Sequence, residues 1–308
     1  MRKLLSYAVV SLVGLFMACS SSTDNKKPVE AKLYILSTTG MIDDAVARVG
    51  GDLVAHDALM GPGVDPHLYK ATQGDLTKLN KADLILYNGL HLEGKMGAIF
   101  EKFSRRKNIR AIGDELAPES LRISSDFSNG KDPHIWFNVA LWMDAVKVVE
   151  EALIALDKKN EAIYRENTKI YLEELKLLHE DTRRKIAAIP VNQRTLVTAH
   201  DAFGYFGEAY GIEVRGLQGI STVSEYGLKD ISDMVTMITE KKIKAVFVES
   251  SVSTKALEAV VEGCEHKGHK LTIGGELFSD AMGNKNSPEG TYIGMVKHNV
   301  NTIYNALK

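Results

Sequence analysis

One long segment near the middle of the chain constrains the fold most. Residues 159–188 contain neither glycine nor proline, and helix-forming residues dominate them. A helix of this length spans about 45 Å at a rise of 1.5 Å per residue. A flexible hinge would instead be rich in glycine and serine. We therefore predict a rigid linker helix at residues 159–189, in preference to a long surface helix within one lobe.

Short apolar runs alternate with helical stretches on both sides of this segment. Such alternation is typical of parallel sheets covered by helices. We predict an α/β fold of two similar (βα)4 lobes with mostly parallel sheets, at residues 33–158 and 190–308, joined by the linker helix. The expected strands are "KLYILSTT", "DLVAHDALM", "DLILYNG" and "IRAIGD" before the linker, and "TLVTAHDAF", "EVRGLQG", "IKAVFVES" and "HKLTIGGEL" after it.

The N-terminus indicates export. Two basic residues precede an apolar run, Leu4 to Ala18, and Cys19 and three serines follow. A basic start, an apolar run and a small residue are typical of a secretory signal, and the run is shorter than the roughly 20 residues of a membrane span. We expect a signal peptide at residues 1–18, a lipid on Cys19 and a polar tether at residues 19–32. Plain secretion with cleavage nearby is the alternative.

Composition excludes some classes of function. The formal net charge is −2, so no global basic field indicates a nucleic-acid partner. Apart from Cys19, the only cysteine in the sequence is Cys264, so we expect no intramolecular disulfide.

Four polar residues stand at or soon after predicted strand ends, where open α/β sheets bind ligands. They are His67 in "DPHLY", His134 in "DPHIW", His200 at the end of "TLVTAH", and Asp280 after "LTIGG". Two precede the linker and two follow it, and we expect all four to face one cleft. Three imidazoles and a carboxylate suit a divalent transition metal such as Zn²⁺ or Mn²⁺. The absence of cysteine ligands argues against a permanent structural zinc site.

Other candidates compete with this set. Glu249 ends a predicted strand, where it would ligate the metal or hydrogen-bond a ligand imidazole. Glu225 is a second candidate for such an outer contact, but we favour a helix-start role for it, because carboxylates are favourable near a helix start. His91 follows a core strand and is a minor candidate. "CEHKGH", residues 264–269, has chelating spacing, but cationic side chains also stabilise a helix C-terminus, and we favour that explanation.

Several motifs together resemble the metal-binding lipoproteins of bacterial ABC transporters, the cluster named for TroA, from about residue 33 to 308. The resemblance implies two (βα)4 lobes joined by one long helix, with His67, His134, His200 and Asp280 binding a divalent metal between them. It also implies a monomeric, non-enzymatic receptor with a membrane permease and a cytoplasmic ATPase as partners. The motifs are "MGPGVDPHLY", "ADLILYNGLHLE", "DPHIWF", "VTAHDAFGYF", "GLQGIST", "VFVESS" and "GGELFSDAMG".

Two features bear on the metal. His200 stands where dedicated manganese binders of this family carry Glu. The His-rich insertion usual in zinc-dedicated members is absent from residues 113–131. The sequence therefore looks most like the TroA type, which is associated with both Zn²⁺ and Mn²⁺.

Two other classes of function remain open. A secreted zinc metallohydrolase would use Glu249 as its general base. A protein of the same fold that binds an iron chelate or a corrinoid is the other alternative. The lipoprotein start and the long helix argue against the first, and the three histidines argue against the second.

Overall fold

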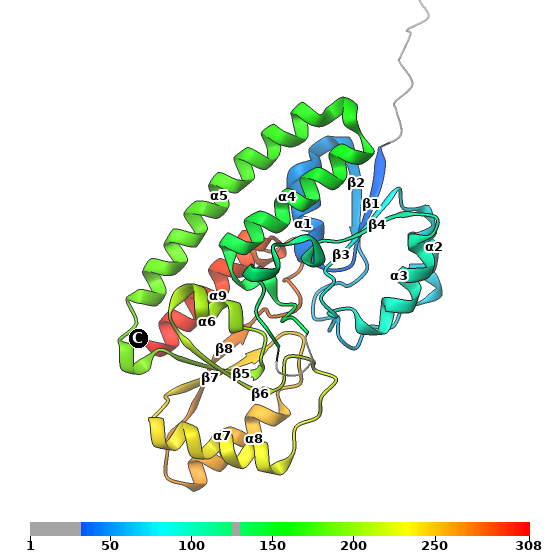
Figure 1. The fold of residues 1–308 in the computed structure, drawn as a ribbon. Helices are drawn as coiled ribbons and strands as arrows, with labels where there is room; N and C mark the ends of the chain where they lie inside the picture. The colour runs from blue at the N-terminus through cyan, green and yellow to red at the C-terminus, as the bar shows by residue number, and fades with distance from the viewer. Residues whose placement is uncertain (1–31, 125–129) are drawn as a thin grey trace, which may run out of the picture. The chain divides into compact units, whose positions relative to one another are not determined.

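Two four-stranded parallel sheets organise the described part of the chain, residues 32–124 and 130–308, in this computed structural model (Figure 1). The strand orders are β2-β1-β3-β4 and β6-β5-β7-β8, and every pairing is parallel. Equivalent strands occupy equivalent places, which confirms the predicted pair of similar α/β lobes. The strands are β1 (Leu33–Ser37), β2 (Val54–Ala58), β3 (Leu84–Tyr87), β4 (Asn108–Ala111), β5 (Thr195–His200), β6 (Glu213–Gln218), β7 (Ala245–Glu249) and β8 (Thr272–Leu277).

Nine α-helices accompany the strands in the described residues. They alternate with the strands along the chain, as predicted for two (βα)4 lobes joined by a linker helix. None of these nine is both long and apolar enough to cross a membrane. The helices are α1 (Gly40–Gly50), α2 (Gln73–Lys81), α3 (Gly97–Ser104), α4 (Val139–Leu156), α5 (Glu161–Ala187), α6 (Gly204–Tyr210), α7 (Leu228–Lys241), α8 (Lys255–His266) and α9 (Tyr292–Leu307).

The predicted linker helix is α5, which has 27 residues and is slightly shorter than expected because Lys158–Asn160 form a 3₁₀ turn. Its length is about 40 Å. It packs on α1 and α4 from the first half of the chain and on α6 and α9 from the second half (Figure 1). One face is buried at helical spacing, so α5 is attached along its length to both lobes. The buried residues are Tyr164, Thr168, Tyr171, Leu175, Leu178, Thr182 and Ile186.

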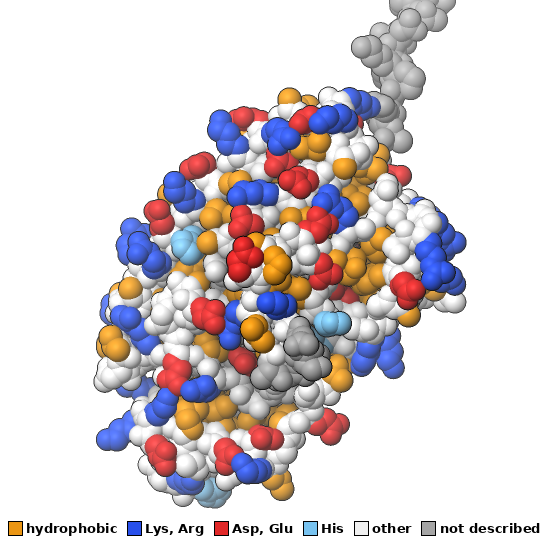
Figure 2. Space-filling model, in the orientation of Figure 1, with side chains coloured by type: hydrophobic (Ala, Val, Ile, Leu, Met, Phe, Trp, Pro, Cys, Tyr) orange, Lys and Arg blue, Asp and Glu red, His pale blue; other side chains and the backbone are white. Residues whose placement is uncertain are grey.

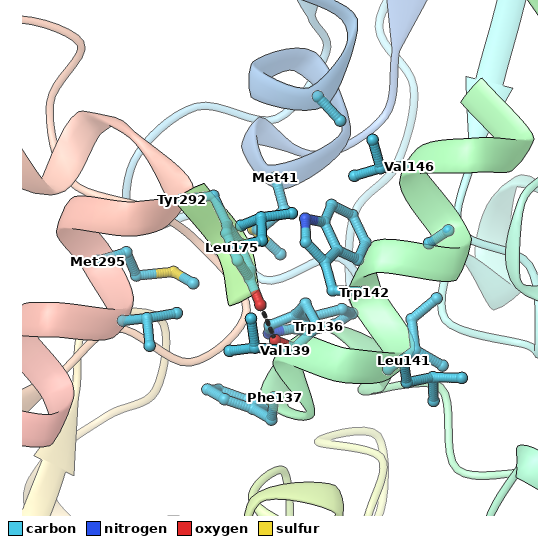
Figure 3. Close-up of a cluster of buried hydrophobic side chains, with 14 of the residues drawn as sticks. Met41, Trp136, Phe137, Val139, Leu141, Trp142, Val146, Leu175, Tyr292 and Met295 are labelled. Atoms are coloured by element: carbon cyan, nitrogen blue, oxygen red, sulfur yellow. Dashed lines mark hydrogen bonds between the residues drawn. The ribbon is translucent and has the colours of Figure 1, made fainter. Parts of the chain in front are cut away.

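One hydrophobic cluster includes residues of both sheets, among them Ile35 and Phe247. Figure 3 shows the part where α1, α4, α5 and α9 meet, with Trp142 stacked on Tyr292 at a ring-centroid distance of 5.2 Å. Tyr292 Oη donates a hydrogen bond to Trp136 O at 2.7 Å. The two lobes therefore share a core beside the segment that carries His134.

The N-terminal predictions, residues 1–18 as signal peptide, Cys19 as lipid site and nearly all of the tether, lie outside the described residues. Over the described part, Figure 2 shows Lys and Arg side chains interspersed with Asp and Glu on the visible face.

Candidate metal centre

The four predicted ligands, His67, His134, His200 and Asp280, come together in the structure. They contribute one potential ligand atom each, and these atoms all lie within 4.8 Å of one another. All four side chains are buried, with at most 2% of any residue exposed. The structure thus brings residues that are far apart in sequence into one enclosed cluster.

The spacing of the donor atoms suits one metal ion. Asp280 Oδ2 lies 3.5 Å from His67 Nε2 and 3.3 Å from His200 Nε2, and Asp280 Oδ1 lies 3.5 Å from His134 Nε2. The Nε2 atoms of His67 and His134 are 3.4 Å apart. Ligands about 2.0–2.1 Å from a tetrahedral ion are about 3.3 Å from one another. Each imidazole therefore presents the same nitrogen at a distance at which one ion contacts all four groups.

The buried carboxylate of Asp280 is surrounded by histidine rings. Among the described residues, the only polar groups recorded near its buried oxygens are the Nε2 atoms of the three imidazoles, at 3.3–3.5 Å. Burial by itself raises the pKa of Asp280, but His200 and then His134 and His67 outweigh it and hold the pKa below its ordinary value. A buried carboxylate with so few donors is unfavourable unless a positive charge neutralises it, and either a protonated His200 or a bound metal ion meets this need.

The repeated Asp-Pro-His sequences form similar turns. Asp65 Oδ1 accepts a hydrogen bond from the His67 N–H at 2.8 Å, and Asp132 Oδ1 accepts one from the His134 N–H at 3.0 Å. These are the local side-chain-to-backbone bonds typical of aspartate turns. Asp132 Oδ1 also lies 2.8 Å from His134 Nδ1, which makes Nδ1 the protonated nitrogen and leaves Nε2 free to bind a metal.

His200 is positioned by two neighbouring strands. It is the last residue of β5, and Glu249 is the last residue of β7. Glu249 Oε1 accepts a hydrogen bond from the His200 N–H at 2.8 Å, and Glu249 Oε2 makes an ion-pair contact with His200 Nδ1 at 2.5 Å. Glu249 was considered both as a metal ligand and as a hydrogen-bond partner of a ligand imidazole. In the structure it is a partner of His200 and lies outside the four-residue cluster.

Burial and charge divide the imidazoles. Burial, the largest effect, lowers the pKa of His67 to about 3. Burial also acts to lower the pKa of His200, but the carboxylates of Glu249 and Asp280 together raise it well above its ordinary value. These surroundings therefore favour a neutral His67 and a protonated His200.

The other candidates lie elsewhere. Glu225 is exposed two residues before Gly227, the N-cap of α7, so it does not begin the helix. Asp230 takes the helix-start role by accepting a hydrogen bond from the Gly227 N–H at 2.8 Å. His91 is exposed in the turn after β3. Glu225 therefore lies in a surface loop that runs for longer than expected before the helix, and its outer contact stays a prediction.

The "CEHKGH" segment has a structural role. Cys264 is fully buried in the core, and the ring of His269 donates from Nε2 to Ile243 O at 2.6 Å. Gly268 has a φ of 75°, in the left-handed region typical of a helix end. These observations support the helix-end explanation over a second metal site.

The segment around His134 is attached to the second lobe as well as the first. Tyr205 Oη donates to Asp132 O at 2.9 Å, and Trp136 Nε1 donates to Ser279 O at 2.9 Å. Sequence reasoning missed these contacts, because no local pattern identifies partners 73 or 143 residues apart. His134 thus belongs to the first lobe by its place in the sequence, as expected, but its loop is hydrogen-bonded to the second lobe as well.

Known proteins share this architecture. The sequence matches the family described as "ZnuA: Zinc-uptake complex component A periplasmic" over residues 35–306. It is 48% identical over 308 residues, all of both chains, to the manganese-binding lipoprotein MntA of Bacillus subtilis (strain 168). It is 30% identical over 311 residues to the metal ABC transporter substrate-binding lipoprotein SloC of Streptococcus mutans serotype c, with 99% of this chain and 98% of that one covered.

A solved structure agrees with these sequence matches. The periplasmic zinc-binding protein TroA of Treponema pallidum is similar with a TM-score of 0.88 and 45% identity, covering 90% of this chain and 99% of that chain. These relatives are binding proteins and not enzymes, so neither the metallohydrolase nor the chelate or corrinoid alternative gains support from them. The resemblance seen in the motifs is confirmed, and the chain belongs to the ZnuA family of solute-binding proteins.

Proposed function

We propose that this protein is the extracytoplasmic solute-binding component of an ABC transporter that captures Zn²⁺ or Mn²⁺ and delivers it to a membrane permease driven by a cytoplasmic ATPase. One observation carries the proposal: three imidazole Nε2 atoms converge on the buried carboxylate of Asp280. The printed names of relatives support both ions, since MntA is called manganese-binding and TroA zinc-binding.

The four residues have distinct roles in this proposal. His67, His134 and His200 ligate the ion through Nε2, and Asp280 supplies oxygen and offsets one of its two charges. Three neutral nitrogen donors bind Zn²⁺ more tightly than Mn²⁺ by the Irving–Williams order. The protein binds the ion and releases it to the permease without any chemical reaction.

The rest of the chain serves delivery. Residues 1–18 direct export, Cys19 carries the lipid, and residues 19–32 tether the binding unit to the outer face of the cytoplasmic membrane or to the cell surface. The protein, with its lobes at residues 33–158 and 190–308, functions as a monomer. The attachment of α5 to both lobes supports small lobe motions during release instead of wide closure.

Elemental analysis of protein purified without chelators tests the proposal. We expect about one transition-metal ion per chain and a loss of affinity in His67→Ala and His200→Ala that exceeds the roughly 10- to 100-fold loss typical of outer-contact variants. His266→Ala, which changes an exposed histidine at the end of α8, is the matched control and keeps full binding. Wild-type protein that holds no transition metal after dialysis against Zn²⁺ and Mn²⁺ would contradict the proposal.

A further inference from the structure

A strained turn follows β3 in the first lobe. Gly89, Leu90 and His91 have φ values of 78°, 53° and 67°. Two of these residues are not glycine, and side chains make this backbone region unfavourable. Such conformations persist where the surroundings impose them, and they concentrate at functional sites. The surroundings of this turn therefore impose its backbone conformation.

Glu93 holds this turn from within the lobe. It is buried, with 4% of the residue exposed, and its Oε1 accepts hydrogen bonds from Thr38 Oγ1 at 2.6 Å and from the Asn88 N–H at 2.8 Å. Its Oε2 accepts from the Gly89 N–H at 3.2 Å. Burial raises the pKa of Glu93, which reflects the cost of placing a carboxylate here. Three donors directed at one buried group fix the backbone at Asn88 and Gly89.

Asn88 connects the turn to the metal centre. Its side chain is buried, and Nδ2 donates to Gly89 O at 3.1 Å and to Pro133 O at 3.0 Å. Pro133 precedes His134, so its carbonyl belongs to the same peptide group as the His134 N–H. That N–H donates to Asp132 Oδ1. The peptide group before His134 is thus held at both ends. Asn88 donates to its oxygen, which also accepts from the Ile135 N–H at 2.8 Å, and Asp132 accepts from its nitrogen.

The first Asp-Pro-His turn lacks this second support. Its aspartate, Asp65, accepts from the His67 N–H in the same way, but among the described residues nothing donates a hydrogen bond to Pro66 O. The bond from Asn88 is therefore an addition at His134 and not a general requirement of the turn.

We propose that Asn88, oriented by Glu93, is a positioning residue that fixes His134 Nε2 at the metal centre. The inference rests on the proposed function, because it assigns Asn88 a role in binding the transported ion. Asn88 does not touch the ion. It acts by setting the peptide from which the His134 ring projects, so that ligand is ordered before the metal arrives.

Asn88→Asp tests the inference, because it keeps the size of the side chain but replaces the donor facing Pro133 O with an acceptor. Zn²⁺ affinity is measured by competition with a chromophoric chelator, and the visible spectrum of bound Co²⁺ reports ligand geometry. We expect Zn²⁺ affinity to fall by about 10- to 100-fold and the Co²⁺ spectrum to change. Asn80→Asp is the matched control, because Asn80 is exposed on α2 and its Nδ2 also donates to a carbonyl, Leu76 O.

A double-mutant cycle separates positioning from a general structural role. If Asn88 acts through His134, Asn88→Asp causes no further loss of affinity in a His134→Ala background. Equal losses in both backgrounds, or unchanged affinity and spectrum in Asn88→Asp alone, would overturn the inference. Wild-type protein that binds neither Zn²⁺ nor Co²⁺ overturns the proposed function itself, which is a different result.

A milder variant keeps the test open if Asn88→Asp does not fold. Thr38→Val removes one donor from Glu93 and leaves the bond between Asn88 and Pro133 in place. We expect an affinity loss of about two- to tenfold, again only when His134 is present. Unchanged affinity in this variant would overturn the role of Glu93 in orienting Asn88.

Discussion

Thr222 donates a hydrogen bond from Oγ1 to Asp65 Oδ2 at 2.6 Å, and this bond joins the loop after β6 to the loop that carries His67. Asp65 uses its other oxygen to accept from the His67 N–H. Thr222, in the second lobe, is therefore linked through the side chain of Asp65 to His67, a predicted metal ligand in the first lobe. Thr222 is buried and Asp65 is half-buried, so the bond is partly shielded from water.

Thr222→Val should release the ion faster, because it removes the hydroxyl that keeps the two loops together while conserving the shape of the side chain. Hydrogen bonds to charged groups are worth about 1.5–3 kcal/mol, which corresponds to about a 10- to 100-fold faster dissociation if the bond breaks before the ion leaves. The measurement is stopped-flow release of Zn²⁺ into excess chelator. Thr236→Val, at a half-buried position of α7, is the control, and equal rates in all three proteins would refute the idea.

Glu249→Gln should weaken Zn²⁺ binding by about 10- to 100-fold, because an amide nitrogen facing His200 Nδ1 disfavours the protonated Nδ1 that leaves Nε2 free. Isothermal titration with a competing chelator measures the change. Glu225→Gln makes the same chemical replacement at an exposed site and should leave affinity unchanged. Identical affinities for the two variants would show that the contact at His200 has no part in binding.

Metal binding should release protons. The pKa of His200 is raised above its ordinary value, and burial keeps the pKa of His67 at about 3, so His200 must lose a proton before it ligates whereas His67 is already neutral. Affinity should therefore rise with pH until the pH passes the pKa of His200. Calorimetry at about pH 7 in buffers of different ionisation enthalpy should give a release of about one proton per ion. An affinity that stays constant from neutral pH into the acid range would be inconsistent with ligation by His200.

Tyr292→Phe should destabilise the fold by about 1–3 kcal/mol, because it leaves the buried Trp136 O without its donor. Chemical denaturation measures the free energy of unfolding. Tyr304→Phe, on the same helix but only half-buried, should change it by less than about 0.5 kcal/mol. Equal stabilities of the two variants would indicate that this bond between α9 and the His134 segment is unimportant.

Periodicity and composition predict much of the fold. All eight strands lie where apolar runs such as "DLILYNG" and "IKAVFVES" are bounded by turn residues, and α5 follows from a stretch without glycine or proline. The convergence of His67, His134, His200 and Asp280 was also predictable, because residues near the carboxyl ends of parallel strands share one edge of the sheet.

Contacts between distant segments were not predictable. Asn88, Thr222 and Tyr205 carry ordinary polar side chains in turns or at a helix start, and their roles depend on partners more than 40 residues away. The different positions of Glu225 and Glu249 were unpredictable for the same reason. In the sequence both residues are plausible partners of the metal centre. Only Glu249, however, ends a strand that pairs directly with the strand of His200.

Anomalous diffraction at the zinc edge from crystals of the Zn²⁺-loaded protein tests the central claim most directly. We predict one strong peak, about 2.0–2.1 Å from the Nε2 atoms of His67, His134 and His200 and about 2.0–2.2 Å from an oxygen of Asp280. A peak at Cys264, at His266 and His269, or at a site that lacks any one of the three imidazoles would contradict the account.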